Sequence, residues 1–250
     1  MPAFPVIHAV TDSGVVGHAG FLERATSIMR ALGPRGAMHL RSSRASGRRF
    51  HELAAALARV QEETGCWLIV NDRIDIAAAV SARGAQLASH SLLVSDAILV
   101  SPMPVGASIH SVEEAIQAEG DGASWCVAGT VFETPSHVGR APARVTFIEE
   151  VAKAVKIPII AIGGVMPEDV AVLKLAGAHG IATIRGCGWA DGFESSAGAE
   201  DMRRTRLPIP SDAAFVEPVT RYISAYDSES GSGGDDHADS ERHGKGAEPE

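Results

Sequence analysis

The sequence predicts a single-domain α/β protein with a (β/α)₈ barrel, the TIM-barrel architecture, and three observations favour it. Strand-like and helix-like segments alternate about eight times, which is typical of a closed barrel. Residues 157–162 form an apolar run without period-two alternation, as in a parallel strand buried on both faces. The chain of 250 residues is 45% hydrophobic and only 5% aromatic, which suits one α/β core. A doubly wound sheet is the alternative, but the glycine fingerprint expected after its first strand is missing.

Apolar patterns and their boundaries define the expected elements in chain order. The expected strands are 4–11, 37–40, 67–70, 84–87, 105–108, 124–127, 157–162 and 180–184. Helical spacing predicts helices over 21–32, 53–60, 74–80, 112–118 and 147–155. One more helix should begin at Pro167, with the acids Glu168 and Asp169 in its first turn, and should end at Gly177.

Two segments lie outside this plan. Residues 186–211 are long for a connection after a strand and contain the basic run RRTR at 203–206. They form a lid, a phosphate clamp or a solvated loop, and we favour the loop. Residues 228–250 have almost no apolar side chains, so we expect a disordered acidic tail after a folded domain of residues 1–227.

Composition limits the classes of function. The formal charge is −9, and residues 227–250 hold eight acids against Arg242 and Lys245, a net of −6, so residues 1–226 carry about −3. That balance predicts no nucleic-acid surface. No leader pattern and no membrane-length apolar run is visible, and Cys66, Cys126 and Cys187 form no CxxC pair. We expect a cytoplasmic protein without membrane contact, and self-association stays open.

Glycines follow the last two expected strands. Gly163 and Gly164 end one strand, and Ile184, Arg185 and Gly186 end the next. In (β/α)₈ barrels the loops after strands seven and eight frequently hold a phosphate on backbone N–H groups. We therefore predict a phosphate site at these five residues; the alternative is that the glycines only permit tight turns.

Polar residues at the other strand ends should converge on the same mouth of the barrel. They are His39, Arg41, Asn71, Asp72, Ser108, His110, Thr134, Ser136, His137 and Arg185. Such a set suits an anionic substrate and proton transfer. It lacks the nucleophile elbow of a serine hydrolase, and Asp72 is its only carboxylate, so we predict no metal cage and no cofactor.

Several members of this set have structural alternatives. Asp72 can pair with Arg73 or cap the next helix, and Ser108 or Ser111 can cap the helix that contains Glu114. His39 can be an inner-layer residue of the barrel. His110 is the strongest candidate, because the barrel directs it to the mouth and imidazole titrates near neutral pH.

Seven motifs together resemble the thiamine phosphate synthase / TenI family over about residues 6–186. They are VTD at 10–12, HLR at 39–41, NDRIDIAAAV at 71–80, GASIHSVEEA at 106–115, GTVFETPS at 129–136, and AIGGV followed by AGAHGIATI at 161–165 and 176–184. The resemblance implies a barrel that binds a thiazole phosphate at the loops after strands seven and eight.

Departures from the synthase pattern favour the TenI branch. Synthases hold Mg²⁺ with two aspartates; Asp72 matches the first, whereas Ser91 stands at the second position. The lysines that serve the pyrophosphate in synthases are replaced by Ser43 and His137. A pyrophosphate leaving group needs cations, so these losses argue against the synthase reaction.

The TenI resemblance implies a thiazole tautomerase. His110 would move the proton that makes a carboxythiazole phosphate aromatic, with His39 as a rival base. The expected substrate-binding residues are Arg41, Asn71, Asp72, Ser108, Thr134, Ser136 and His137, and Arg41 would hold the carboxylate. The alternatives are thiamine-phosphate synthase, with Mg²⁺ at Asp72, and a non-catalytic sensor of thiamine-precursor phosphates.

Overall fold

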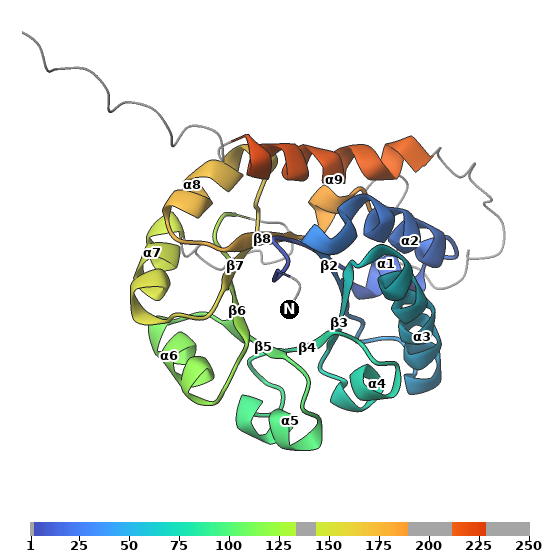
Figure 1. Ribbon diagram of the computed structural model, residues 1–250, viewed down its shortest axis with the longest axis horizontal. Helices are drawn as coiled ribbons and strands as arrows, with labels where there is room; N and C mark the ends of the chain where they lie inside the picture. Colours follow the sequence, from blue (N-terminus) through green and yellow to red (C-terminus); the bar gives the residue numbers. More distant parts are fainter. Residues whose placement is uncertain (1–2, 134–143, 190–211, 229–250) are drawn as a thin grey trace, which may run out of the picture.

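Eight parallel strands close into one barrel in the computed structural model, which describes residues 3–133, 144–189 and 212–228 (Figure 1). Each strand pairs in parallel with the next, and the last pairs with the first. The strands are β1 (Ile7–Val10), β2 (Gly36–Leu40), β3 (Trp67–Asn71), β4 (Gly84–Leu87), β5 (Val105–Ile109), β6 (Trp125–Gly129), β7 (Ile159–Ile162) and β8 (Gly180–Thr183). The predicted (β/α)₈ fold is confirmed. Three strands are shorter than predicted: β1, β7 and β8, the last because Ile184 already has a helical backbone.

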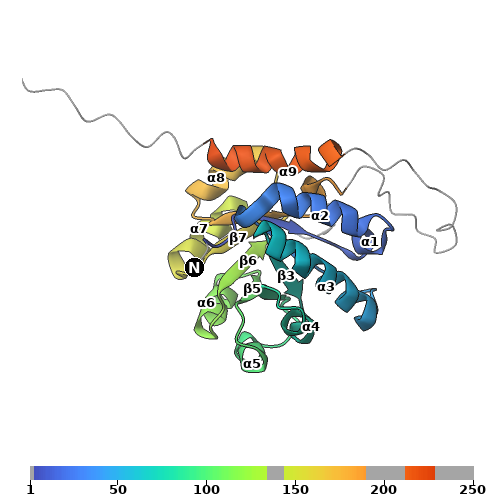
Figure 2. The same cartoon turned by 45° about the vertical axis from the view of Figure 1, so that its right-hand side comes forward.

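Helices form a ring outside the barrel (Figures 1 and 2). The α-helices are α1 (Ser13–Gly17), α2 (Phe21–Leu32), α3 (Gly47–Thr64), α4 (Ile74–Ala79), α5 (Val94–Val100), α6 (Val112–Gly120), α7 (Arg144–Ala154), α8 (Val170–Leu175) and α9 (Asp212–Asp227). Short 3₁₀ turns lie at η1 (Gly33–Arg35), η3 (Pro167–Asp169) and η4 (Arg185–Cys187). Pro167 begins η3 rather than the α-helix, which follows directly from Val170.

Sequence analysis missed α1, α5 and α9. Helix α1 has only five residues and begins where the Asp12 side chain accepts a hydrogen bond from the Val15 N–H. Helix α5 buries Val94 and Ala97 but leaves Leu99 86% exposed, so no one-sided apolar stripe marks it.

Apolar side chains fill the barrel and the layer between barrel and helices. The interior cluster contains Val10, Ala37, Ile69, Trp125, Val127, Ile160 and Ala182. Phe4 closes the amino-terminal end, where its ring lies 5.1 Å from that of Trp125 and 5.5 Å from those of Trp67 and His179. Residues before β1 therefore plug one end of the barrel, and the functional mouth is left to the other end.

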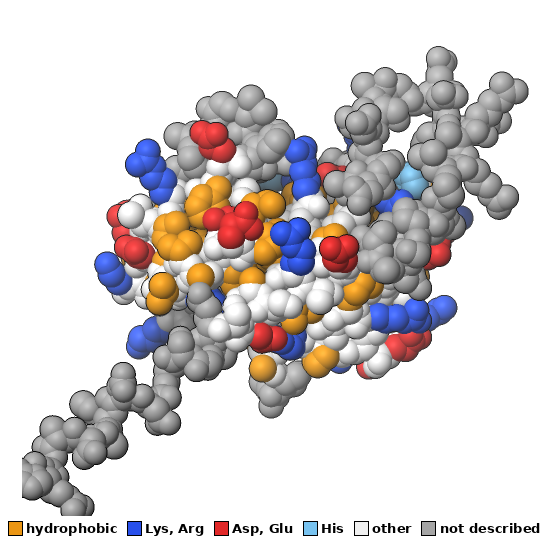
Figure 3. All heavy atoms as spheres, turned by 90° about the horizontal axis from the view of Figure 1, so that it is seen from above, with side chains coloured by type: hydrophobic (Ala, Val, Ile, Leu, Met, Phe, Trp, Pro, Cys, Tyr) orange, Lys and Arg blue, Asp and Glu red, His pale blue; other side chains and the backbone are white. Residues whose placement is uncertain are grey.

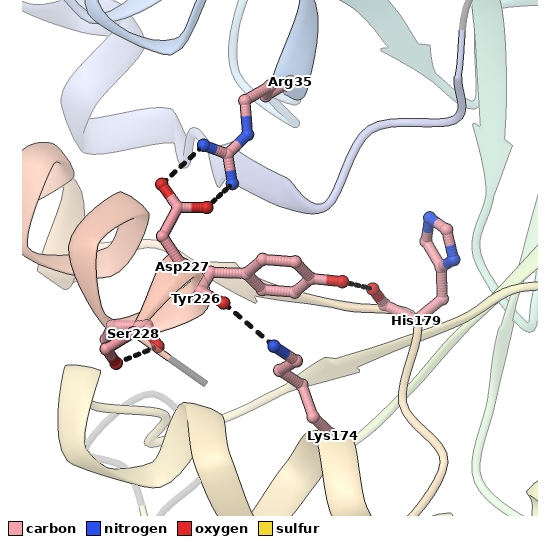
Figure 4. Close-up of polar contacts among 7 residues, drawn as sticks. Arg35, Lys174, His179, Tyr226, Asp227 and Ser228 are labelled. Atoms are coloured by element: carbon pink, nitrogen blue, oxygen red, sulfur yellow. Dashed lines mark hydrogen bonds and ion pairs between the residues drawn. The ribbon is translucent and has the colours of Figure 1, made fainter. Parts of the chain in front are cut away.

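Helix α9 packs on α2 and α8 and completes the ring of helices after β8 (Figures 1 and 2). Its last turn is tied to the barrel body (Figure 4): Arg35 donates two hydrogen bonds of 2.8 and 2.6 Å to Asp227, and Lys174 donates one of 2.8 Å to the Tyr226 carbonyl. The Tyr226 hydroxyl donates to the His179 carbonyl at 2.9 Å. Seen from the α9 side, apolar, acidic and basic side chains are mixed (Figure 3).

These contacts predict how the chain responds to truncation. Removing residues 229–250 should leave the thermal midpoint within about 2 °C of the full chain, because the contacts that hold α9 lie at or before Asp227. Removing 212–250 instead should lower it by many degrees, because the surface of α2 and α8 under α9 becomes exposed. Calorimetry of both truncations is the measurement, and an equal response of the two would contradict this account of α9.

Candidate functional site

The carboxyl ends of the eight strands form the mouth of the barrel, and most predicted site residues lie there. Asn71 ends β3 and Asp72 follows it, Ser108 and His110 stand at the end of β5, and the glycine pair follows β7. Arg185 begins the turn η4 after β8, and Arg41 follows β2. Thr134, Ser136 and His137 lie outside the described residues, as do the predicted tail beyond Ser228 and residues 190–211 of the long connection. Those predictions stay predictions.

His110 is exposed at the mouth and is held in a defined tautomer. Its Nδ1 lies 2.6 Å from the Gly129 carbonyl oxygen, which can only accept a hydrogen bond. Nδ1 therefore carries the proton of the neutral ring, and Nε2 keeps a free lone pair. The backbone supports this position, because the His110 N–H donates to Glu114 Oε2 at 2.6 Å. The arrangement offers a base at the end of β5.

The chain turns directly after His110, where the side chain of Ser111 caps the start of α6. Of the two caps that the sequence left open, Ser111 is the one that forms: its hydroxyl accepts the Glu114 N–H at 3.1 Å. Ser108 has no part in this cap. Its hydroxyl oxygen accepts a 3.1 Å hydrogen bond from Gln86 instead.

Asp72 is bonded to the loop after β4. Its Oδ1 accepts hydrogen bonds from the Ala88 N–H, at 3.0 Å, and from the Ser91 hydroxyl. Neither predicted alternative is correct: Arg73 pairs with Asp75 at 2.9 and 2.6 Å, and α4 has no side-chain cap. Ser91, which the resemblance aligns with the second metal-binding aspartate of synthases, thus donates a hydrogen bond to Asp72.

His39 lies inside the barrel, 2% exposed, and this placement favours the inner-layer alternative over a role as rival base. Its Nε2 is 2.8 Å from His8 Nδ1, and His8 Nε2 is 3.1 Å from the Pro5 carbonyl. Because the carbonyl only accepts, His8 donates through Nε2, and His39 donates to His8 Nδ1.

Burial keeps both histidines neutral. Desolvation lowers the pKa of His8 to about 4, against an opposing hydrogen bond to Pro5. Desolvation, and then the neighbouring His8, holds the pKa of His39 well below its usual range, although a hydrogen bond with Asn71 acts in the opposite direction. The hydrogen bond between them needs one facing nitrogen without a proton, so the two imidazoles cannot both be charged.

Gly163 and Gly164 lie so close to the loop after β6 that a side chain at either position would meet it. Their φ angles are +103° and +65°. A Cβ on Gly163 would lie 2.4 Å from Thr130 Cγ2, and one on Gly164 would lie 2.5 Å from the Glu133 carbonyl oxygen. The chain after β6 crosses directly over them, with the Phe132 N–H bonded to the Gly163 carbonyl at 2.9 Å. The two glycines thus permit the close approach of this loop, and phosphate binding at them stays a prediction.

The end of β8 has a second tight contact. The Gly186 N–H donates to Thr183 Oγ1 at 3.1 Å, and a Cβ on Gly186 would lie 2.2 Å from the Tyr222 hydroxyl of α9. Arg185 is exposed and forms no salt bridge with any residue in the described ranges. Its guanidinium is therefore available to an anion at the mouth.

A closed parallel barrel with polar groups on its carboxyl rim defines the (β/α)₈ class in which active sites lie at that rim. A family model described as thiamine monophosphate synthase matches residues 7–187. The chain therefore belongs to the thiamine monophosphate synthase family, whose members serve thiamine biosynthesis.

Individual relatives agree with this assignment. The chain is 34% identical over 180 residues to thiamine-phosphate synthase of Pyrococcus horikoshii, covering 71% of this chain and 83% of that protein. It is 36% identical over 200 residues to thiamine-phosphate synthase of Chlorobium luteolum, covering 78% and 91%. The solved thiamine phosphate pyrophosphorylase of Pyrococcus furiosus shares the fold, with a TM-score of 0.69, 24% identity and coverage of 89% and 96%. No helix in the described ranges has the length and apolar character that crossing a membrane requires.

The buried histidine pair predicts acid sensitivity. In the unfolded chain both histidines bind protons below about pH 6.5, whereas the folded chain resists protonation down to about pH 4 at His8. Their contribution to stability is complete above pH 6.5 and is lost as pH falls, at about 1.4 kcal/mol per pH unit for each histidine. We expect the free energy of unfolding, measured with urea, to fall between pH 7 and pH 5.

The matched variants are His39→Gln and His90→Gln. His39→Gln should make this pH slope shallower, whereas replacement of the exposed His90 should leave it unchanged. A slope that is the same in all three proteins would show that the pair does not titrate as described.

Proposed function

We propose that this chain joins a thiazole phosphate to hydroxymethylpyrimidine diphosphate, the reaction that gives thiamine-phosphate synthase its name. One observation carries the proposal: similarity to the family extends over residues 7–187, and both relatives named above are synthases. The comparisons thus favour the synthase alternative over the TenI branch that the sequence departures favoured.

Groups at the mouth fit an anionic substrate. We expect the thiazole phosphate beside Gly163, Gly164 and Gly186, with the Arg185 guanidinium donating charge-assisted hydrogen bonds. Arg41, after β2, adds a second exposed cation to the same rim. Two cations and glycine-rich loops on a rim without a cluster of described acids are a suitable environment for phosphate oxygens.

Mg²⁺ would have one protein carboxylate here. Within the described residues no three His, Cys, Asp or Glu side chains gather as a metal site. Asp72 has Oδ2 left for a cation, since Oδ1 accepts two hydrogen bonds. Mg²⁺ commonly binds through one or two carboxylates together with substrate phosphates, so Asp72 fits a cation that arrives with the diphosphate. The bound cation would neutralise charge on the departing diphosphate.

A second candidate function is thiazole tautomerisation, and the Asp72–Ser91 contact favours it. A serine in place of the second carboxylate weakens the case for a cation, whereas proton transfer needs none. His110 Nε2, with its lone pair directed away from Gly129, would take a ring proton and return it to the exocyclic carbon.

Two assays on the same protein separate these functions. One follows Mg²⁺-dependent formation of thiamine phosphate from the two precursors, and the other follows solvent deuterium exchange into a carboxythiazole phosphate. Condensation supports the synthase proposal, whereas exchange without condensation replaces it with the tautomerase. Binding of thiazole phosphate with neither reaction would identify a sensor.

His110 should carry any exchange activity. We expect His110→Ala to lower kcat for deuterium exchange by at least about 10²-fold, with phosphate binding nearly unchanged, since the ring acts on protons and not on the phosphate. His137→Ala is the control, because His137 is the other histidine predicted at the mouth. If His137→Ala loses exchange while His110→Ala keeps it, the base has been assigned to the wrong residue.

Free protein should bind Mg²⁺ only weakly, and one substitution should change this. Calorimetry without substrate should give a Kd above about 1 mM, because Asp72 is a lone carboxylate. Ser91→Asp should tighten binding at least about tenfold by supplying a second carboxylate, whereas Ser91→Asn should not. Micromolar affinity in the unsubstituted protein would contradict the account of Asp72.

A further inference from the structure

Trp125 occupies a space inside the barrel that two glycines keep open. It begins β6 and is fully buried. A Cβ on Gly106 of β5 would lie 2.1 Å from the indole Nε1, and one on Gly84 of β4 would lie 2.8 Å from Cη2. Carbon atoms do not approach this closely, so any larger residue at either position would displace the indole. Glycines on the neighbouring strands β4 and β5 thus leave the space that the Trp125 indole fills.

The indole fixes the orientation of a buried amide. Trp125 Nε1 donates a 2.7 Å hydrogen bond to Oε1 of Gln86, which is 2% exposed. Indole nitrogen can only donate, so the amide oxygen must face Trp125 and the amide nitrogen must face the other way. That nitrogen donates to Ser108 Oγ at 3.1 Å and has a longer contact of 3.4 Å with the Leu87 carbonyl. Each polar atom of Gln86 is therefore occupied.

We propose that Trp125 and Gln86 are positioning residues that orient the Ser108 hydroxyl as a hydrogen-bond donor into the mouth. Because Gln86 Nε2 has no lone pair, Ser108 must accept from it and cannot return its own proton. Ser108 is half-buried and stands two residues before His110. The end of β5 then presents a donor at Ser108 and an acceptor at His110 Nε2.

The direction of the Ser108 hydrogen bond indicates which kind of ligand atom lies opposite it. The Ser108 proton cannot go to Gln86, so we expect an acceptor of the ligand opposite it, such as a ring nitrogen or an anionic oxygen. This step rests on the proposed function, which places the thiazole phosphate at the mouth. The chain of hydrogen bonds from Trp125 through Gln86 to Ser108, called the relay below, rests only on contacts within the barrel.

Gln86→Glu tests the relay at nearly constant shape. A carboxylate still accepts from Trp125 but would require Ser108 to donate inward. We expect the Kd for thiazole phosphate, measured by calorimetry, to rise at least about tenfold. Gln86→Leu, which removes both bonds, should raise it several-fold. In a Ser108→Ala background both substitutions should change Kd by no more than about twofold. Thermal unfolding of each variant verifies that it is folded.

The decisive comparison is between the change in Kd in the wild-type background and the change in the Ser108→Ala background. An equal rise with and without the Ser108 hydroxyl would reduce Gln86 to a structural role and overturn the proposal. No rise for either substitution would overturn it as well.

A ligand-free measurement separates this proposal from the proposed function. In ¹H–¹⁵N spectra the Trp125 indole signal, identified by its loss in Trp125→Phe, should exchange slowly with solvent and should shift in Gln86→Leu. If these hold and thiazole phosphate does not bind, the proposed function fails and the relay stands. An indole proton that exchanges as fast as in free tryptophan would remove the relay.

Discussion

The pairing of β8 with β1 is the interaction on which the site depends. Ile7 lies opposite Ile181 and Ala9 opposite Thr183, and this parallel register closes the sheet. Closure brings the carboxyl ends of all eight strands to one rim, so residues as distant in sequence as Arg41 and Arg185 share a mouth. At the opposite end Phe4 packs against three rings and excludes that end as a site. Barrel topology and the Phe4 contacts together favour the carboxyl rim as the place of the site.

Two sets of polar side chains inside the barrel satisfy one another by hydrogen bonds, whereas Trp67 Nε1 and Asn71 Oδ1 are buried without a partner among the described residues. His8 and His39 share one hydrogen bond, and Trp125, Gln86 and Ser108 form a short relay. Both arrangements reach toward the mouth, through Asn71 in the first case and Ser108 in the second. In each, a group that can only donate or only accept sets the direction of the next hydrogen bond. The direction of the Ser108 hydrogen bond at the rim thereby follows from residues inside the barrel.

Sequence patterns predicted the fold well because buried parallel strands and amphipathic helices have distinct periods. They also located His110, since barrel topology alone directs the residue after β5 to the mouth. They could not assign His39, because alternation along β2 says which face a residue occupies but not whether its layer is interior or rim. Gln86 and Trp125 were missed for a related reason. Their contact joins β4 to β6, and its only trace in sequence is the pair of glycines at 84 and 106. The partners of Asp72 likewise depended on the path of the loop after β4.

The central claim is that a thiazole phosphate binds at this mouth with its phosphate on the loops after β7 and β8. A crystal structure with thiazole phosphate tests it most directly. The account predicts phosphate oxygens beside Gly163, Gly164 and Arg185, and an acceptor atom of the ligand within hydrogen-bond distance of Ser108 Oγ. A phosphate bound elsewhere on the barrel, or a ligand donor facing Ser108, would contradict it.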